Sequence, residues 1–137
     1  MDRTRIHHIG IVLPNRERAE QFMEIFNFEI DCEEYVDAYH AQCVFTKCKD
    51  QEVAVEFIIP TEGVLTQYNN GKGGIHHIAL QVDDVEAVRK EYEEKGLKML
   101  EEAAVPGACG IIVNFLRPKY GAGILVEFVQ RLNKDSV

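Results

Sequence analysis

The sequence predicts an α+β protein built from two tandem β-α-β-β-β modules, residues 5–60 and 74–131. A repeat is the first observation behind this prediction: residues 6–13 are Ile-His-His-Ile-Gly-Ile-Val-Leu, and residues 75–82 are Ile-His-His-Ile-Ala-Leu-Gln-Val. Both segments alternate as strands do, and each is followed by a helical pattern and three further strand-like segments. The length of the chain fits one compact unit, so we treat residues 1–137 as a single domain.

A helix is expected after each copy of the repeat. Asn15 can cap the first helix, and Asp83 or Asp84 can cap the second. Asn27 and Gly96 stand at matching positions and can adopt the left-handed conformation that ends a helix. The apolar face of each helix is formed by Ala19, Phe22, Met23 and Phe26 in the first and by Val85, Val88 and Tyr92 in the second.

Three strand-like segments follow each predicted helix. They cover 28–35, 39–47 and 52–60 in the first module and 97–104, 110–116 and 124–131 in the second. A glycine-rich turn region at 69–74 links the modules, and residues 61–68 are expected to form one short helical turn before it.

Each module carries a histidine on its first strand and a glutamate on its last. His8 and His77 match in the repeat, while Glu56 and Glu127 each lie in the middle of an apolar strand. A carboxylate in such a strand is costly to bury unless it meets a cation or strong hydrogen bonds. These four side chains therefore predict a site for one divalent metal ion. The alternative, satisfied core histidines and outward-facing glutamates copied by duplication, stays open.

Side-chain alternation along a strand places the two neighbouring histidines of each pair on opposite faces. The first histidine of each pair, His7 or His76, falls on the more apolar face, which we expect to lie under or beside a helix. The second histidine shares the other face with a small residue, Gly10 or Ala79, and is expected to line a cavity.

The predicted ligands also limit which metal ions can bind and what kind of site they form. Two nitrogen and two oxygen ligands suit cobalt, nickel, manganese, zinc or iron. A six-coordinate ion would keep two open positions, as a catalytic metal does, and could polarise a substrate carbonyl. We therefore expect a divalent metal cofactor and an enzyme.

Composition excludes other classes of function. The net charge is −8 with no basic patch, which argues against a nucleic-acid partner. No apolar run approaches the roughly 20 residues of a membrane span, and no apolar signal region precedes the first strand, so we expect a cytoplasmic protein. The four cysteines form no C-x-x-C pair and are expected to be reduced.

The sequence resembles the vicinal oxygen chelate superfamily, the glyoxalase and dioxygenase group, over residues 5–130. Within it, the methylmalonyl-CoA epimerases are the most similar family. The segments that carry the resemblance are His-His-Ile-Gly-Ile-Val at 7–12, Gly-Ile-His-His-Ile-Ala-Leu at 74–80, Gly-Ala-Cys-Gly at 107–110, Arg-Pro-Lys at 117–119 and Gly-Ile-Leu-Val-Glu-Phe at 123–128.

The resemblance implies two modules that pair into a U-shaped cup of mixed sheet. It implies a metal held inside by residues that match His8, Glu56, His77 and Glu127, with two oxygens of a small substrate, an acyl-CoA or a thiol adduct, on the metal. It also implies removal and return of a proton beside a chelated carbonyl, and a homodimer.

Some residues depart from the pattern of the family. Gln42 stands near the place of a catalytic glutamate in some epimerases and cannot act as a base. Arg117 replaces a histidine of the family. The remaining catalytic candidates are Glu127 and, as a substitute base, His40, for which an ordinary surface histidine is the alternative.

Three other functions stay open. A lactoylglutathione lyase (glyoxalase I) would use the same proton chemistry on a hemithioacetal. A ring-cleaving dioxygenase needs iron on two histidines and one carboxylate, so the extra Glu56 argues against it. A non-catalytic small-molecule-binding protein of the superfamily usually lacks metal ligands, and here all four are present.

Overall fold

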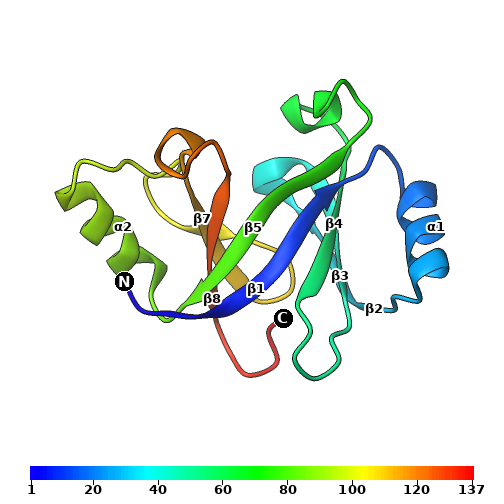
Figure 1. The fold of residues 1–137 in the computed structure, drawn as a ribbon, viewed down its shortest axis with the longest axis horizontal. Helices are drawn as coiled ribbons and strands as arrows, with labels where there is room; N and C mark the ends of the chain where they lie inside the picture. The colour runs from blue at the N-terminus through cyan, green and yellow to red at the C-terminus, as the bar shows by residue number, and fades with distance from the viewer.

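The computed structural model describes all 137 residues and contains two β-α-β-β-β modules that share one eight-stranded sheet (Figure 1). The first module consists of β1 (Arg3–Val12), α1 (Arg16–Phe26), β2 (Ile30–Val36), β3 (Ala41–Thr46) and β4 (Ala54–Pro60). The second consists of β5 (Gly74–Val82), α2 (Val85–Glu94), β6 (Val105–Pro106), β7 (Ile111–Leu116) and β8 (Val126–Arg131). Short 3-10 helices are η1 (Asp37–Tyr39), η2 (Val64–Gln67) and η3 (Pro118–Tyr120). The predicted fold class is confirmed, and η2 is the predicted helical turn.

The two modules meet through their first strands. The strand order is β2-β3-β4-β1-β5-β8-β7-β6, with β1 and β5 antiparallel at the centre. β4 runs parallel to β1, and β8 runs parallel to β5. In Figure 1, β1 and β5 cross the middle of the molecule, and α1 and α2 lie at opposite ends of it. Because the pairing occurs within one chain, the cup needs no second copy to form.

Side-chain alternation in β4 and β8 separates the helix-covered face from the inside of the cup. Phe57 is fully buried with Ala19 and Met23 of α1 in one apolar cluster. Phe128 is buried with residues of α2 in the equivalent cluster of the second module. The neighbouring glutamates, Glu56 and Glu127, therefore point to the inside of the cup.

The helices begin and end where the sequence predicts. The Asn15 side chain accepts a hydrogen bond from the Arg18 amide at the start of α1, and Asp84 accepts one from Ala87 at the start of α2. Asn27 has φ 61° after α1, and Gly96 has φ 78° after α2. Of the two predicted caps for the second helix, Asp84 is the one used.

The predicted strand at 97–104 is wrong. Only Val105–Pro106 forms the two-residue strand β6, and Met99 makes an isolated bridge to Leu116. The side chain of buried Asn114 explains the difference: it accepts from the Glu101 amide and donates to the Glu101 carbonyl, at 3.0 Å each. A side chain thus takes the hydrogen bonds that a neighbouring strand would have made.

The expectation of four reduced cysteines is also wrong. Cys32 of β2 and Cys109, in the loop before β7, form a disulfide across a sequence separation of 77. Cys43 and Cys48 are free. The disulfide joins the edge strand of the first module to the second, so only the closed tertiary fold brings its two partners together. None of the helices is long and apolar enough to span a membrane.

Candidate metal centre

Strand register places the four predicted ligands in two adjacent rows across the sheet. In one row, Glu56 of β4 and His77 of β5 flank Gly10 of β1. In the other row, His8 of β1 and Glu127 of β8 flank Ala79 of β5. Each row thus holds one histidine and one glutamate with a small residue between them. The repeat and the antiparallel pairing of β1 with β5 together create this arrangement.

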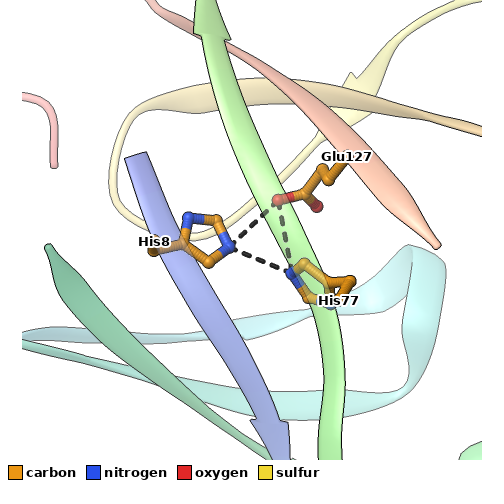
Figure 2. A group of neighbouring side chains, drawn as sticks. All are labelled: His8, His77 and Glu127. Carbon is orange, nitrogen blue, oxygen red and sulfur yellow. Dashed lines mark hydrogen bonds and ion pairs between the residues drawn. The ribbon is translucent and has the colours of Figure 1, made fainter. Parts of the chain in front are cut away.

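The ligating atoms of the four side chains converge. Nε2 of His8 lies 3.0 Å from Nε2 of His77, 3.0 Å from Oε1 of Glu127 and 3.3 Å from Oε1 of Glu56. Nε2 of His77 lies 3.5 Å from Oε1 of Glu127 and 3.6 Å from Oε1 of Glu56. Figure 2 shows the rings of His8 and His77 turned toward each other and toward Glu127, from β1, β5 and β8.

All four side chains are nearly excluded from solvent. The exposed fraction is 0% for His8, 3% for His77, 7% for Glu56 and 5% for Glu127. Oε1 of Glu127 makes no well-directed hydrogen bond, although it lies 3.0 Å from Nε2 of His8 and such buried oxygens are normally satisfied. The structure therefore buries two carboxylates beside two imidazoles and leaves one carboxylate oxygen without a well-directed hydrogen bond.

The buried imidazoles and carboxylates shift each other's pKa values. Burial by itself would lower the pKa of His8, but the carboxylates of Glu56 and Glu127 outweigh it and raise the pKa to about 9. Burial would raise the pKa of Glu127, but the imidazoles of His77 and His8 hold it well below its usual range. The protein without a metal therefore compensates its buried carboxylates with a proton on His8.

The donor set fits a transition-metal ion. Two donors about 2.1 Å from one ion are about 3.0 Å apart at a right angle and about 3.4 Å apart at a tetrahedral angle. The separations between imidazole nitrogens and carboxylate oxygens given above fall close to this range. The unsatisfied Oε1 of Glu127 is the kind of atom that a cation would satisfy. The ligating atoms of His8, His77 and Glu127 all lie within 4.8 Å of one another; Glu56 falls outside this group of three, although its Oε1 is 3.3 Å from Nε2 of His8.

The predicted position of His7 and His76 is wrong. The β1–β5 register shifts by one residue at His7 and again at His76, so each is the extra residue of a bulge. Nδ1 of His7 lies 2.7 Å from Nδ1 of His8, and Nδ1 of His76 lies 2.9 Å from Nδ1 of His77. Both members of each pair thus lie together beside the site, and neither His7 nor His76 packs under a helix. Burial and the neighbouring imidazole lower the pKa of His7 and of His76 to about 4.

A cavity of about 240 Å³ opens beside the candidate metal centre, and three of the four candidate ligands line it. Its polar lining groups include Glu56, Glu127 and His77, and it has no lysine or arginine. The hydroxyl of Tyr39, another lining residue, is buried without a hydrogen-bond partner. Sequence reasoning missed Tyr39, because a tyrosine in a short 3-10 helix carries no spacing signal. The apolar lining comes from both modules and includes Val36, Ile58, Leu65, Ile111, Val113 and Phe115.

His40, the other catalytic candidate, does not line this cavity. Nδ1 of His40 pairs with Glu62 at 3.1 Å, and half of the His40 side chain is exposed. Gln42 donates to Glu33 and does not line the cavity either. Of the two catalytic residues expected from the sequence, the structure brings only Glu127 to the candidate site.

Comparison with known proteins identifies the class. The sequence model of the Glyoxalase/Bleomycin resistance protein/Dioxygenase superfamily matches residues 7–115, so the chain belongs to this superfamily. The fold described above agrees with that membership.

The following relatives are epimerases that, by their names, act on malonyl-CoA derivatives. The ethylmalonyl-CoA/methylmalonyl-CoA epimerase of Cereibacter sphaeroides is 30% identical over 132 residues, which cover 92% of this chain and 97% of the relative. The mitochondrial methylmalonyl-CoA epimerase of Mus musculus is 26% identical and aligned over 92% of this chain and 72% of its own. A variant of the Streptomyces coelicolor methylmalonyl-CoA epimerase, solved with 2-nitronate-propionyl-CoA, is 27% identical with a TM-score of 0.86, covering 96% of this chain and all of that one.

Proposed function

We propose that the protein is a metal-dependent epimerase that moves the hydrogen at carbon 2 of a 2-substituted malonyl-CoA, with methylmalonyl-CoA as its main substrate. The observation that carries this proposal is the convergence of two imidazoles and two carboxylates beside an apolar cavity. The similarity to epimerases over nine-tenths of the chain supports the choice of substrate.

His8, Glu56, His77 and Glu127 would hold the ion. Their mixed nitrogen and oxygen donors suit cobalt, nickel, manganese, zinc or iron. A divalent cation held there would polarise the thioester carbonyl and so acidify the hydrogen at carbon 2. No lysine or arginine lines the cavity, so the negative charge of the malonyl carboxylate also depends on this cation for compensation.

We assign the two carboxyl groups to proton transfer on opposite faces of the substrate. The strand order β4-β1-β5-β8 puts Glu56 and Glu127 on opposite sides of the two histidine strands. In our assignment Glu127 accepts the proton from carbon 2, and the bonding electron pair moves toward the thioester carbonyl. Glu56 begins the cycle protonated, and the proton that it returns to the opposite face of carbon 2 inverts the configuration. Glu127 then holds the substrate proton and Glu56 is ionised. Exchange of both groups with solvent after product release restores their starting states, so the product carries one hydrogen from solvent.

The apolar wall of the cavity supports proton transfer while the substrate is bound. The lining residues are largely aliphatic or aromatic, so bulk water has little access to carbon 2 once the substrate fills the cavity. Exclusion of water strengthens the electrostatic interactions inside the site and limits loss of the proton.

Isotope exchange at carbon 2 tests the proposal. Metal-loaded protein is incubated in deuterated water with one epimer of methylmalonyl-CoA, and the product is analysed by nuclear magnetic resonance. We expect deuterium at carbon 2 together with formation of the other epimer. Glu127→Gln should abolish both, whereas Glu24→Gln, a change of an exposed glutamate on α1, should abolish neither.

Two results would contradict the proposal. Conversion of the hemithioacetal of methylglyoxal and glutathione, without exchange in methylmalonyl-CoA, would identify a lactoylglutathione lyase activity. Binding of methylmalonyl-CoA by the loaded protein without any exchange would identify a binding protein.

A further inference from the structure

The two histidine pairs share one geometry. In each pair, the second histidine directs Nε2 to the candidate metal centre, and its other ring nitrogen, Nδ1, faces Nδ1 of the histidine before it. The Nδ1–Nδ1 distance is 2.7 Å between His7 and His8 and 2.9 Å between His76 and His77. Both distances are in the range of a hydrogen bond, so one nitrogen of each pair donates and the other accepts.

The bulges make these contacts possible. In a regular strand, neighbouring side chains point to opposite faces, so two successive histidines cannot face each other. An extra residue in β1 at His7 and in β5 at His76 removes this alternation locally. Each module therefore has one histidine pair at a bulge, because the repeat supplies a pair to each of the two paired strands.

Metal binding would fix the direction of each hydrogen bond. An imidazole that ligates a metal through Nε2 has no proton on that nitrogen and carries its proton on Nδ1. Nδ1 of His8 and of His77 is therefore the donor, and the acceptor is Nδ1 of the preceding histidine. That preceding histidine must in turn carry its single proton on Nε2.

We propose that His7 and His76 are positioning residues, which fix the tautomer and the ring orientation of His8 and His77 for metal binding. Ligating histidines usually donate their second ring N–H to a carboxylate, a backbone carbonyl or water. Here a second imidazole takes that part in both modules. This inference rests on the proposed metal ligands.

The surroundings of the two positioning residues differ. His7 is 1% exposed and packs edge-on against Phe45, with ring centroids 6.0 Å apart. His76 is only half-buried, lines the cavity and packs against the ring of Tyr68 at 4.9 Å. Because His7 is more deeply buried than His76, water replaces its acceptor less readily, so loss of that acceptor should weaken metal binding more than the same loss at His76.

Metal affinity tests the inference without any catalytic assay. Leucine has no acceptor, whereas asparagine places its side-chain oxygen near the position of Nδ1. We expect His7→Leu and His76→Leu to weaken Zn²⁺ binding, measured by competition with a chelating dye, by about 10- to 100-fold. His7→Asn and His76→Asn should restore most of the affinity. His40→Asn, a change of the histidine paired with Glu62 outside the cavity, should leave it unchanged.

The variants also separate this inference from the proposed function. The positioning role alone would be overturned if the leucine variants fold and bind Zn²⁺ as tightly as the unmodified protein, while Glu127→Gln binds Zn²⁺ more weakly. Full affinity in Glu127→Gln would instead overturn the ligand set on which the role depends.

If a leucine variant does not fold, a measurement on the unmodified protein can still test the inference. With ¹⁵N-labelled histidine and bound Zn²⁺, nuclear magnetic resonance should find the proton on Nε2 in His7 and His76 and on Nδ1 in His8 and His77. A proton on Nδ1 of His7 and of His76 would overturn the inference.

Discussion

The imidazole of His77 occupies the space that a side chain at Gly10 would need. The two residues face each other across the β1–β5 pair, and a Cβ added at Gly10 would overlap the ring of His77. Gly10 is therefore a condition for the position of His77, and through it for the convergence with His8.

The Gly10→Ala variant tests this relationship. We expect the His77 ring to be displaced, Zn²⁺ affinity to fall by at least about tenfold, and overpacking to cost about 1–3 kcal/mol of stability. Metal titration and chemical denaturation measure the two effects. Ala79→Gly, in the other row, removes a Cβ instead of adding one and should keep the affinity. Equal affinity in Gly10→Ala and the unmodified protein would show that His77 has no fixed place in the site.

Metal binding should depend on pH through His8. The carboxylates beside His8 raise its pKa to about 9, so the metal-free protein carries a proton there at neutral pH. A metal must displace that proton. We therefore expect affinity to rise about tenfold per pH unit below pH 9 and to level off above it. Calorimetry in buffers of different ionisation enthalpy should find about one proton released per ion at pH 7. No release at that pH would contradict the prediction.

The buried hydroxyl of Tyr39 should contact the substrate. It lines the cavity without a partner, and the ring of Tyr39 packs edge-on against Phe115 with centroids 5.7 Å apart. Tyr39→Phe keeps this packing and removes only the hydroxyl. We expect kcat/KM to fall by about tenfold, or about 1.4 kcal/mol, with unchanged metal content. Tyr35→Phe is the control, because the Tyr35 hydroxyl pairs with Thr61 outside the cavity. Equal losses in both variants would refute a specific contact.

The disulfide should stabilise the closed cup. It links Cys32 to Cys109 over 77 residues, and closing so long a loop typically contributes about 2–4 kcal/mol. We expect Cys32→Ala or a thiol reductant to lower the free energy of unfolding in urea by about this amount. Cys48→Ala, a change of an exposed free cysteine, should have little effect. Four reactive thiols in the denatured, unreduced protein would contradict the prediction, which expects two.

The repeat is what made the fold and the convergence of the site residues predictable. Matching positions identified His8, His77, Glu56 and Glu127, and apolar flanks such as Phe57 indicated which face of each last strand is covered. The binding of a metal by these residues stays a prediction.

The remaining features depend on tertiary structure. One extra residue in the pairing moved His7 and His76 off the face that strict alternation assigns, and alternation cannot report such a bulge. The disulfide joins residues that only the curled sheet brings together. The segment at 97–104 has strand-like composition, but the Asn114 side chain takes its hydrogen bonds.

The metal content of the protein tests the central claim most directly. The purified protein is reconstituted separately with cobalt, nickel, manganese, zinc and iron, dialysed and analysed for metal, beside Glu127→Gln and the surface control Glu24→Gln. If the two imidazoles and two carboxylates share one ion, at least one metal should remain at about one equivalent per chain in the unmodified protein and the control, and be largely lost from Glu127→Gln. Retention of none of the five metals, or equal retention by Glu127→Gln, would contradict the account.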